Sequence, residues 1–329
     1  MEVVSEMNKY IRTDDLYKFY NNTPKDKNPE SFKYLDELIH SGQKEIQLDH
    51  DIILDTSSDD EIDEYIYGIK IDVDNIVIKG NGHTIDACNR TRIFNNSGKN
   101  VILEKLLLQN GYAEDGAAIS NKDGTFLIRH SLLQNNQAYF GGAVDNLPDS
   151  STILMNNILK NNTGVRGGAI HNIDGKVLIR DTTMEENDAA RGGAVFNKNG
   201  KMKLQFTTIK RNVARGCGGG VYNTDGKIWI EDSTINYNEA SSNGGGVANF
   251  GFAEITGTFM ENNTAFEDGG AIYINFDGKT MIHGGYIENN TAWNLGGGIW
   301  SFEKRDVEEN MCNIYSNTPD DTYYGDELQ

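Results

Sequence analysis

The sequence contains little proline, few cysteines and no long apolar run. Only 4 of its 329 residues are proline, so it does not have the composition of a proline-rich disordered linker. The three cysteines, Cys88, Cys217 and Cys312, are far apart and odd in number. They therefore indicate neither a disulfide framework nor a metal-ligand spacing. No apolar run approaches the roughly 18 residues of a membrane-spanning helix, so we expect no membrane span.

Basic residues are scarce relative to acidic ones. The chain has 30 Lys and Arg against 49 Asp and Glu, which gives a formal charge of −19 at pH 7. Because nucleic acids and anionic membranes are bound by clustered Lys and Arg, this charge argues against both as partners. The first residues, MEVVSEMNKYIRTDD, lack the basic flank and apolar stretch of a signal peptide. That absence by itself favours a cytoplasmic location.

Glycine and asparagine are abundant, with 36 and 38 residues, and they recur in a repeat. The string GGA[IV]xN, or a close variant, occurs eight times at spacings of 25 to 27 residues, beginning at Gly116, Gly141, Gly167, Gly192, Gly218, Gly244, Gly269 and Gly296. An Asn with an apolar residue three positions earlier precedes each string: Asn110, Asn136, Asn162, Asn187, Asn212, Asn238, Asn263 and Asn290. Such a regular period is typical of a solenoid.

Each repeat contains three short segments in which apolar and polar residues alternate, which is the pattern of β-strands. Turn dipeptides such as Asp174-Gly175 and Asp225-Gly226 separate the first two segments. Three strands in about 25 residues leave no room for a crossover helix, so each repeat is predicted to form one triangular coil of a parallel β-helix. Aliphatic columns would fill its interior. The Asn residues would form structural columns in which amides bond each other along the axis.

The chain divides into four parts on this pattern. Residues 1–45 form an N-terminal segment, 46–115 irregular first coils, 116–321 the regular coils and 322–329 a C-terminal tail. Residues 29–41 are predicted to form an amphipathic helix that covers the open end of the solenoid, with Asn28 as N-cap, Pro29 as the first helical residue and Gly42 just after the end.

The paired markers resemble the repeats of chlamydial polymorphic outer-membrane proteins, and those of adhesin-like β-helix proteins of bacteria and methanogenic archaea. The similarity covers roughly residues 100–321; GGAV at 192–195 with IKRN at 209–212 is representative. The chlamydial FxxN motif begins with Phe, which is mostly Leu, Met or Ile here. The resemblance implies an all-β fold: a right-handed, single-stranded parallel β-helix of pectin-lyase type, of about ten coils. It also implies exposure at the cell surface and a role in adhesion.

In each glycine string, the residue two positions after the Ala or third Gly is expected to point away from the solenoid interior. These residues form one column along the axis. It reads Ser120, Asp145, His171, Phe196, Tyr222, Ala248, Tyr273 and Trp300. Aromatic rings on a smooth strand can stack against sugar faces, so the candidate ligand-binding residues are Tyr222, Phe266, Tyr273, Trp293 and Trp300. The alternative is a ladder of rings that only stiffens the sheet.

Signs of catalysis or metal binding are weak. Glu231 and Glu254 lie at outward positions of adjacent coils and are the one carboxylate pair worth testing as catalytic residues. Turn aspartates, including Asp123, Asp174 and Asp225, could collect Ca²⁺, although lysines beside them and ordinary Asp-Gly turn chemistry offer a simpler explanation. No other metal or cofactor is indicated. We expect His83 and His171 to be turn and surface residues.

The sequence therefore predicts a non-enzymatic, adhesin-like rod that binds a glycan or a cell-surface protein. A carbohydrate-active enzyme, either a polysaccharide lyase or a glycoside hydrolase, is the alternative, and a structural or phage-fibre module is a further one. The oligomeric state stays open.

Overall fold

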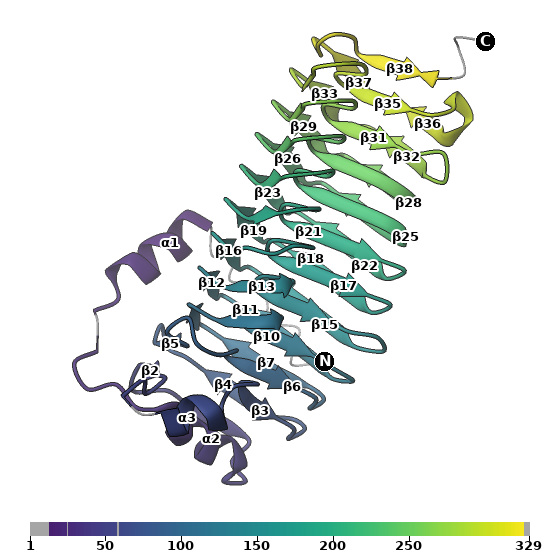
Figure 1. Ribbon diagram of the computed structural model, residues 1–329. Helices are drawn as coiled ribbons and strands as arrows, with labels where there is room; N and C mark the ends of the chain where they lie inside the picture. Colours follow the sequence, from purple (N-terminus) through teal and green to yellow (C-terminus); the bar gives the residue numbers. More distant parts are fainter. Residues whose placement is uncertain (1–12, 25, 58, 326–329) are drawn as a thin grey trace.

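The computed structural model describes residues 13–24, 26–57 and 59–325. It is a right-handed parallel β-solenoid of about ten turns with a small helical cap at its N-terminal end (Figure 1). The expected right-handed parallel β-helix of about ten coils is therefore confirmed. No helix in the described ranges is long and apolar enough to cross a membrane.

Every coil contributes strands to the same columns, which are labelled in Figure 1. In the regular coils, the first column begins at the Ile or Val of each glycine string. The column contains β3 (Ile69–Ile71), β6 (Phe94–Asn96), β10 (Ile119–Asn121), β14 (Val144–Asn146), β17 (Ile170–Ile173), β21 (Val195–Lys198), β25 (Val221–Glu231), β28 (Val247–Thr256), β31 (Ile272–Ile274), β35 (Ile299–Ser301) and β38 (Thr322–Tyr324). β25 and β28 are long enough to continue into the second column, so both columns belong to one twenty-stranded sheet.

The remaining strands complete the coil. The second column otherwise contains β1 (Glu45–Gln47), β4 (Val77–Lys79), β7 (Val101–Glu104), β11 (Thr125–Arg129), β15 (Ser151–Met155), β18 (Lys176–Arg180), β22 (Lys201–Gln205), β32 (Lys279–His283) and β36 (Val307–Asn310). The third column is a separate eleven-stranded sheet of β2 (Ile52–Ile53), β5 (Thr84–Asp86), β8 (Leu107–Gln109), β12 (Leu132–Gln134), β16 (Ile158–Lys160), β19 (Thr183–Glu185), β23 (Thr208–Lys210), β26 (Thr234–Asn236), β29 (Phe259–Glu261), β33 (Tyr286–Glu288) and β37 (Asn313–Tyr315). Short strands line the corner that leads back to the next coil: β9 (Tyr112–Asp115), β13 (Gln137–Phe140), β20 (Asp188–Ala189), β24 (Val213–Ala214), β27 (Glu239–Ala240), β30 (Thr264–Ala265) and β34 (Thr291–Ala292).

Aliphatic side chains stack in register inside the solenoid. Ile170, for example, lies opposite Val144 and Val195 of the neighbouring coils and is fully buried. The predicted interior columns therefore form one continuous hydrophobic core.

The glycine strings form a tight corner rather than a binding loop. Gly167 has a φ of 69°, and a Cβ added there would lie 2.1 Å from the Ile170 carbonyl oxygen. A Cβ on Gly168 would lie 2.1 Å from the carbonyl oxygen of Gly193 in the next coil. The first glycine is thus needed for the left-handed backbone and the second for the close approach of coils.

Buried Asn side chains form two ladders along the axis. The predicted ladder is present from Asn136 to Asn317, and each Nδ2 donates to the Oδ1 of the next coil at 2.9–3.0 Å. A second ladder, from Asn96 to Asn249, uses Asn96 and the Asn that ends each glycine string from Gly116 to Gly244, at 2.7–3.0 Å. This second ladder is not predicted in the sequence analysis above.

The predicted place of Asn110 in the first ladder is wrong. Gln109 pairs with Gln134, so Asn110 aligns with Asn135 rather than with Asn136. The Gly111 amide occupies the ladder position and donates to Asn136 Oδ1 at 2.9 Å. Asn110 has a φ of 56° and donates to the carboxylate of Asp86 instead.

The N-terminal cap is a helix, but it begins later than predicted. Helix α2 spans Phe32–His40, and the Ser31 hydroxyl, not Asn28, accepts from the Tyr34 amide at its start. Glu30 cannot join the helix because it forms a parallel bridge with Ile52. Gly42, with a φ of 87°, follows the helix as predicted. A short helix that the sequence did not indicate, α3 (Asp59–Glu64), lies beside α2 (Figure 1).

Two further segments, one near each end of the chain, pack onto the solenoid or extend it. Helix α1 (Thr13–Asn22) packs on the side of the third-column sheet, where Leu16 and Tyr20 bury against Leu132 and Ile158 (Figure 1). The segment expected to be a C-terminal tail contributes β38, which pairs with β35 and so extends the solenoid. Residues 1–12 and 326–329, which we assigned to the terminal segments, lie outside the described residues.

Candidate functional site

One outer face of the solenoid carries a column of varied side chains, which we call the outer column. Its members occupy equivalent positions of successive first-column strands: Asn95, Ser120, Asp145, His171, Phe196, Tyr222, Ala248, Tyr273, Trp300 and Tyr323. The polar members lie towards the N-terminal end and the aromatic members towards the C-terminal end. The face is therefore chemically graded along the rod.

Aromatic rings from Phe196 to Trp300 contact one another in a continuous row. Phe196 and Tyr222 have ring centroids 5.0 Å apart and planes 8° apart, while Tyr273 and Trp300 are 4.6 Å and 9° apart. Ala248 would interrupt the row, but Phe250 fills the space at 5.0 Å from Tyr222 and 5.9 Å from Tyr273. Sequence reasoning missed Phe250, although it lies two residues beyond Ala248 and therefore on the same face.

The row does not present all of its rings to solvent. Tyr222 is only 6% exposed and Phe196 only 2%, so the expectation that rings rise freely from a smooth strand is wrong for these two. Tyr273 and Trp300 are half-buried and retain accessible surface. Burial raises the pKa of the Tyr273 hydroxyl to about 12, so it is protonated and able to donate at neutral pH.

Corner residues form a wall beside the outer column. They immediately precede the left-handed glycines and comprise Asp115, Phe140, Arg166, Arg191, Cys217, Asn243, Asp268 and Leu295. We call them the corner column. Arg166 lies over the rings of Phe140 and Phe196, 5.5 and 5.7 Å from their centroids, and Arg191 lies 5.8 Å from the centroid of Tyr222. The outer column and the corner column thus lie side by side; we call the strip of surface that they form the furrow, and cavities open along it near both of its ends.

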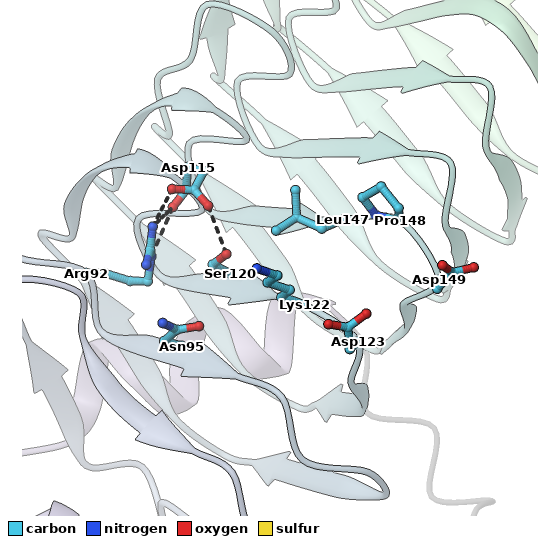
Figure 2. Close-up of a pocket in the computed structure, with 9 residues that line it drawn as sticks. All are labelled: Arg92, Asn95, Asp115, Ser120, Lys122, Asp123, Leu147, Pro148 and Asp149. Atoms are coloured by element: carbon cyan, nitrogen blue, oxygen red, sulfur yellow. Dashed lines mark hydrogen bonds and ion pairs between the residues drawn. The ribbon is translucent and has the colours of Figure 1, made fainter.

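At the N-terminal end of the furrow, a polar network fixes the corner of the first coils. Arg92 donates to the carboxylate and backbone carbonyl of Asp115, and Ser120 Oγ donates to Asp115 Oδ2 at 3.0 Å (Figure 2). These three line a cavity of about 420 Å³ together with residues such as Lys122 and Leu147. Because Asp115 accepts from both neighbours, its charge is already compensated.

The adjacent cavity, of about 290 Å³, shares Asp115 and Leu147 with the first one and contains a buried dyad. His171 Nδ1 lies 2.7 Å from Asp145 Oδ1. Burial raises the pKa of the Asp145 carboxyl, and the hydrogen bond from His171 opposes part of that rise. His171 was expected at the surface, but it is only 3% exposed because Phe140 and Phe196 lie on either side of its ring.

At the C-terminal end, a cavity of about 470 Å³ is lined by aromatic and acidic side chains: Asp268, Leu295, Trp300, Phe302, Glu303, Tyr323 and Gly325. Asp268 Oδ1 accepts from Asn294 Nδ2 at 2.8 Å and from the Leu295 amide at 3.1 Å. Its Oδ2 has no hydrogen bond within the described part of the chain. Burial raises the pKa of Asp268, although the two hydrogen bonds oppose that shift.

The two remaining candidate aromatic residues, Phe266 and Trp293, lie in the corner loops. Phe266 and Trp293 stack with centroids 4.4 Å apart, and Trp293 is 69% exposed. Among the residues described, no ring contact joins this pair to Tyr273 and Trp300. The candidate aromatic residues therefore lie in two separate groups of rings.

The candidate catalytic carboxylates are not directly opposite each other. Glu254 lies opposite Trp229, whereas Glu231 lies opposite Thr256. Glu231 forms an ion pair with Lys203 at 2.8 Å and accepts from Gln205. Partial burial would raise the pKa of Glu231, but these hydrogen bonds outweigh it and lower the pKa. Such a paired carboxylate is poorly suited to act as a general acid.

The turn aspartates occupy left-handed corner positions. Asp123, Asp149, Asp174 and Asp225 have φ values between 54° and 62°. In the part of the chain that the structure describes, no three His, Cys, Asp or Glu side chains are grouped to hold a metal ion. His83, the other histidine singled out above, pairs with Asp51 at 3.1 Å.

Comparisons of the chain with protein-family models, with curated proteins and with solved structures give no match, so the geometry of the furrow carries the functional argument.

Proposed function

We propose that this protein is a non-enzymatic binding rod that holds a glycan against the C-terminal end of the furrow. The observation that carries the proposal is the position of Trp300. Its ring stacks on Tyr273 and borders the 470 Å³ cavity that Tyr323 and two carboxylates also line.

This combination suits a sugar because a pyranose has an apolar face and a polar rim. The indole and phenol rings offer flat apolar surface for the C–H face. The free Oδ2 of Asp268 and the carboxylate of Glu303 can accept hydrogen bonds from hydroxyl groups at the rim. Ligand sites generally combine aromatic walls with a few placed polar groups in this way.

The rigidity of the outer column also supports binding. Trp300 lies in register with Tyr273 and Tyr323, each in a strand paired to its neighbour. Ring stacking restricts the rotamers before a ligand arrives, so little side-chain entropy remains to be lost on binding.

The test compares Trp300→Ala with Tyr286→Ala on an array of neutral oligosaccharides. Tyr286 is a matched control, because its ring contacts that of Phe259 in the neighbouring coil, with centroids 4.4 Å apart, but belongs to the third-column sheet. We expect Trp300→Ala to lower affinity at least tenfold and Tyr286→Ala to leave it unchanged, with both variants folded by circular dichroism. The proposal fails if the wild type binds no glycan or if a folded Trp300→Ala variant binds as well as the wild type.

A further inference from the structure

The second cavity, at His171, has features that the binding of a glycan at Trp300 does not use. His171 Nδ1 lies 2.7 Å from Asp145 Oδ1, and in the tautomer whose Nδ1 donates to this carboxylate, Nε2 carries the free lone pair. This Nε2 atom is buried and has no hydrogen-bond partner within the described residues. A buried polar atom without a partner is rare in folded proteins and calls for a ligand or another explanation.

Arg166 supplies donors next to this acceptor. Its guanidinium lies over Phe140 and Phe196, the two rings between which the imidazole lies. Its side chain makes no hydrogen bond or ion pair with the residues described, so its N–H groups are available. The cavity therefore presents an acceptor and a donor close together.

The rest of the lining is apolar or acidic. Phe140, Leu147 and Ile173 provide an apolar surface, and Glu114 and Asp115 provide carboxylates. Asp145 adds a further buried acidic group. Arg92 compensates Asp115, so Arg166 faces the carboxyl groups of Glu114 and Asp145, and the lining has no surplus of positive charge that would favour a carboxylate ligand over an uncharged one.

We propose that this cavity is a second subsite, which binds an uncharged sugar residue through a hydroxyl group. The hydroxyl donates to His171 Nε2 and accepts from Arg166, while the C–H surface of the sugar packs on Phe140 and Leu147. This inference rests on the proposed glycan-binding function and deepens it, because it selects neutral over acidic sugars. Five coils separate His171 from Trp300, which at the usual strand spacing is about 24 Å, so one extended glycan can contact both.

The dyad is assigned to binding rather than to catalysis. A Ser–His–Asp relay needs the serine hydroxyl to donate to the histidine. Ser120 Oγ, in the same column, donates to Asp115 instead. The column therefore provides no activated nucleophile at this cavity.

The experiment follows the ¹⁵N resonance of His171 Nε2 while methyl pyranosides of glucose, galactose and mannose are added, with glucuronate and galacturonate for comparison. We expect at least one neutral pyranoside to shift this resonance in the wild type and in Trp300→Ala. Arg166→Gln should weaken that response at least tenfold. Arg191→Gln is the matched control, since Arg191 occupies the next coil of the corner column over a tyrosine, and it should respond like the wild type.

A double variant, His171→Phe with Asp145→Ala, removes the dyad while keeping side-chain types that the column already contains at Phe196 and Ala248. This variant should stay folded, but the neutral pyranosides should no longer shift the methyl resonances of Leu147 and Ile173, which line the cavity. The inference is overturned if no neutral pyranoside perturbs His171, if the uronates bind more tightly, or if Arg191→Gln weakens binding as much as Arg166→Gln. In any of those cases, a loss of binding to the oligosaccharide array in Trp300→Ala would still support the glycan site at Trp300 alone.

Discussion

Asn187 Nδ2 donates to Asn212 Oδ1, one coil further along, at 2.9 Å, and also to the Leu159 carbonyl at 3.1 Å. Asn187 Oδ1 in turn accepts from the backbone and side-chain amides of Asn162, both at 3.0 Å. Each amide thus ties three coils together at a buried corner. Because buried backbone groups need partners, the ladder satisfies groups that the turn would otherwise leave unpaired.

Replacing Asn187 by Leu should destabilise the solenoid by roughly 3 kcal/mol or more, because several buried polar groups lose a partner and each costs about 1–3 kcal/mol. Urea unfolding followed by circular dichroism measures the change. Lys201→Leu is the control, since Lys201 is exposed on β22 and surface changes usually stay within about 0.5 kcal/mol. A free energy of unfolding for Asn187→Leu equal to that of the control would contradict the role of the ladder.

Weakening the helical cap at the N-terminal end should lower stability and promote aggregation. Leu35 is fully buried where α2 packs on β2 and β3. Leu35→Ala should lower stability by about 2–5 kcal/mol. It should also promote aggregation, because loosening the cap exposes apolar core and unpaired strand edges. Glu37→Ala, on the exposed side of α2, should do neither. Light scattering during mild heating tests this, and equal scattering by both variants would show that α2 is not a protective cap.

Docking of α1 should depend on pH through Glu185. This carboxylate is 4% exposed and accepts from Tyr17 of α1 and from Lys160 and Lys210, at 3.1 and 3.0 Å for the lysines. Burial alone would raise the pKa of Glu185, but these hydrogen bonds outweigh it and lower the pKa below 4.5. A lowered folded-state pKa gives stability that is present above about pH 4.5 and is lost as the pH falls through the folded value.

Hydrogen exchange of residues 13–22 is the measurement for this prediction. Their protection should decrease as the pH falls below about 4.5, after correction for intrinsic exchange rates, and Glu185→Gln should remove that dependence. Protection of the coils near β28 serves as an internal control. If α1 keeps its protection at low pH in the wild type, the carboxylate does not anchor the helix.

Glu231→Gln provides a test of the enzyme alternative. The Glu231–Lys203 pair is partly exposed, so its loss should change stability by no more than about 1 kcal/mol. Because the carboxylate is engaged in that pair and offset from Glu254, glycan binding should be unaffected, as should any reducing-end release from polysaccharide. A loss of hydrolytic or lyase turnover in Glu231→Gln, against an active wild type, would reinstate catalysis.

The repeat made most of the fold predictable, because a constant period of Gly and Asn forces equivalent residues into register. The aliphatic columns and the first Asn ladder followed directly from it. The predicted ladder position of Asn110 was wrong because Gly111 occupies that position in its coil. Sequence spacing alone cannot separate two registers that differ by one residue. The predicted start of α2 was wrong because Glu30 forms a bridge with Ile52, which is distant in sequence. Local capping signals contain no information about such a long-range contact.

The candidate site was predictable only in part. The outer column was identified by its alternation, but burial of Tyr222 depends on Phe196 and Arg191, which come from other coils. The dyad of Asp145 and His171 was hidden because the two residues are 26 positions apart in sequence. It could have been found from their shared column, had the chemical complementarity of adjacent members been considered.

The central claim is that Trp300 contacts a glycan, and fluorescence tests it most directly. The chain has three tryptophans, Trp229, Trp293 and Trp300, so Trp229→Phe with Trp293→Phe leaves Trp300 as the sole indole reporter. Titration with neutral hexasaccharides of the glucose, mannose and galactose series should shift or quench its emission saturably for at least one series. An emission that stays unchanged with every series, in a protein that keeps its circular dichroism spectrum, would contradict the account.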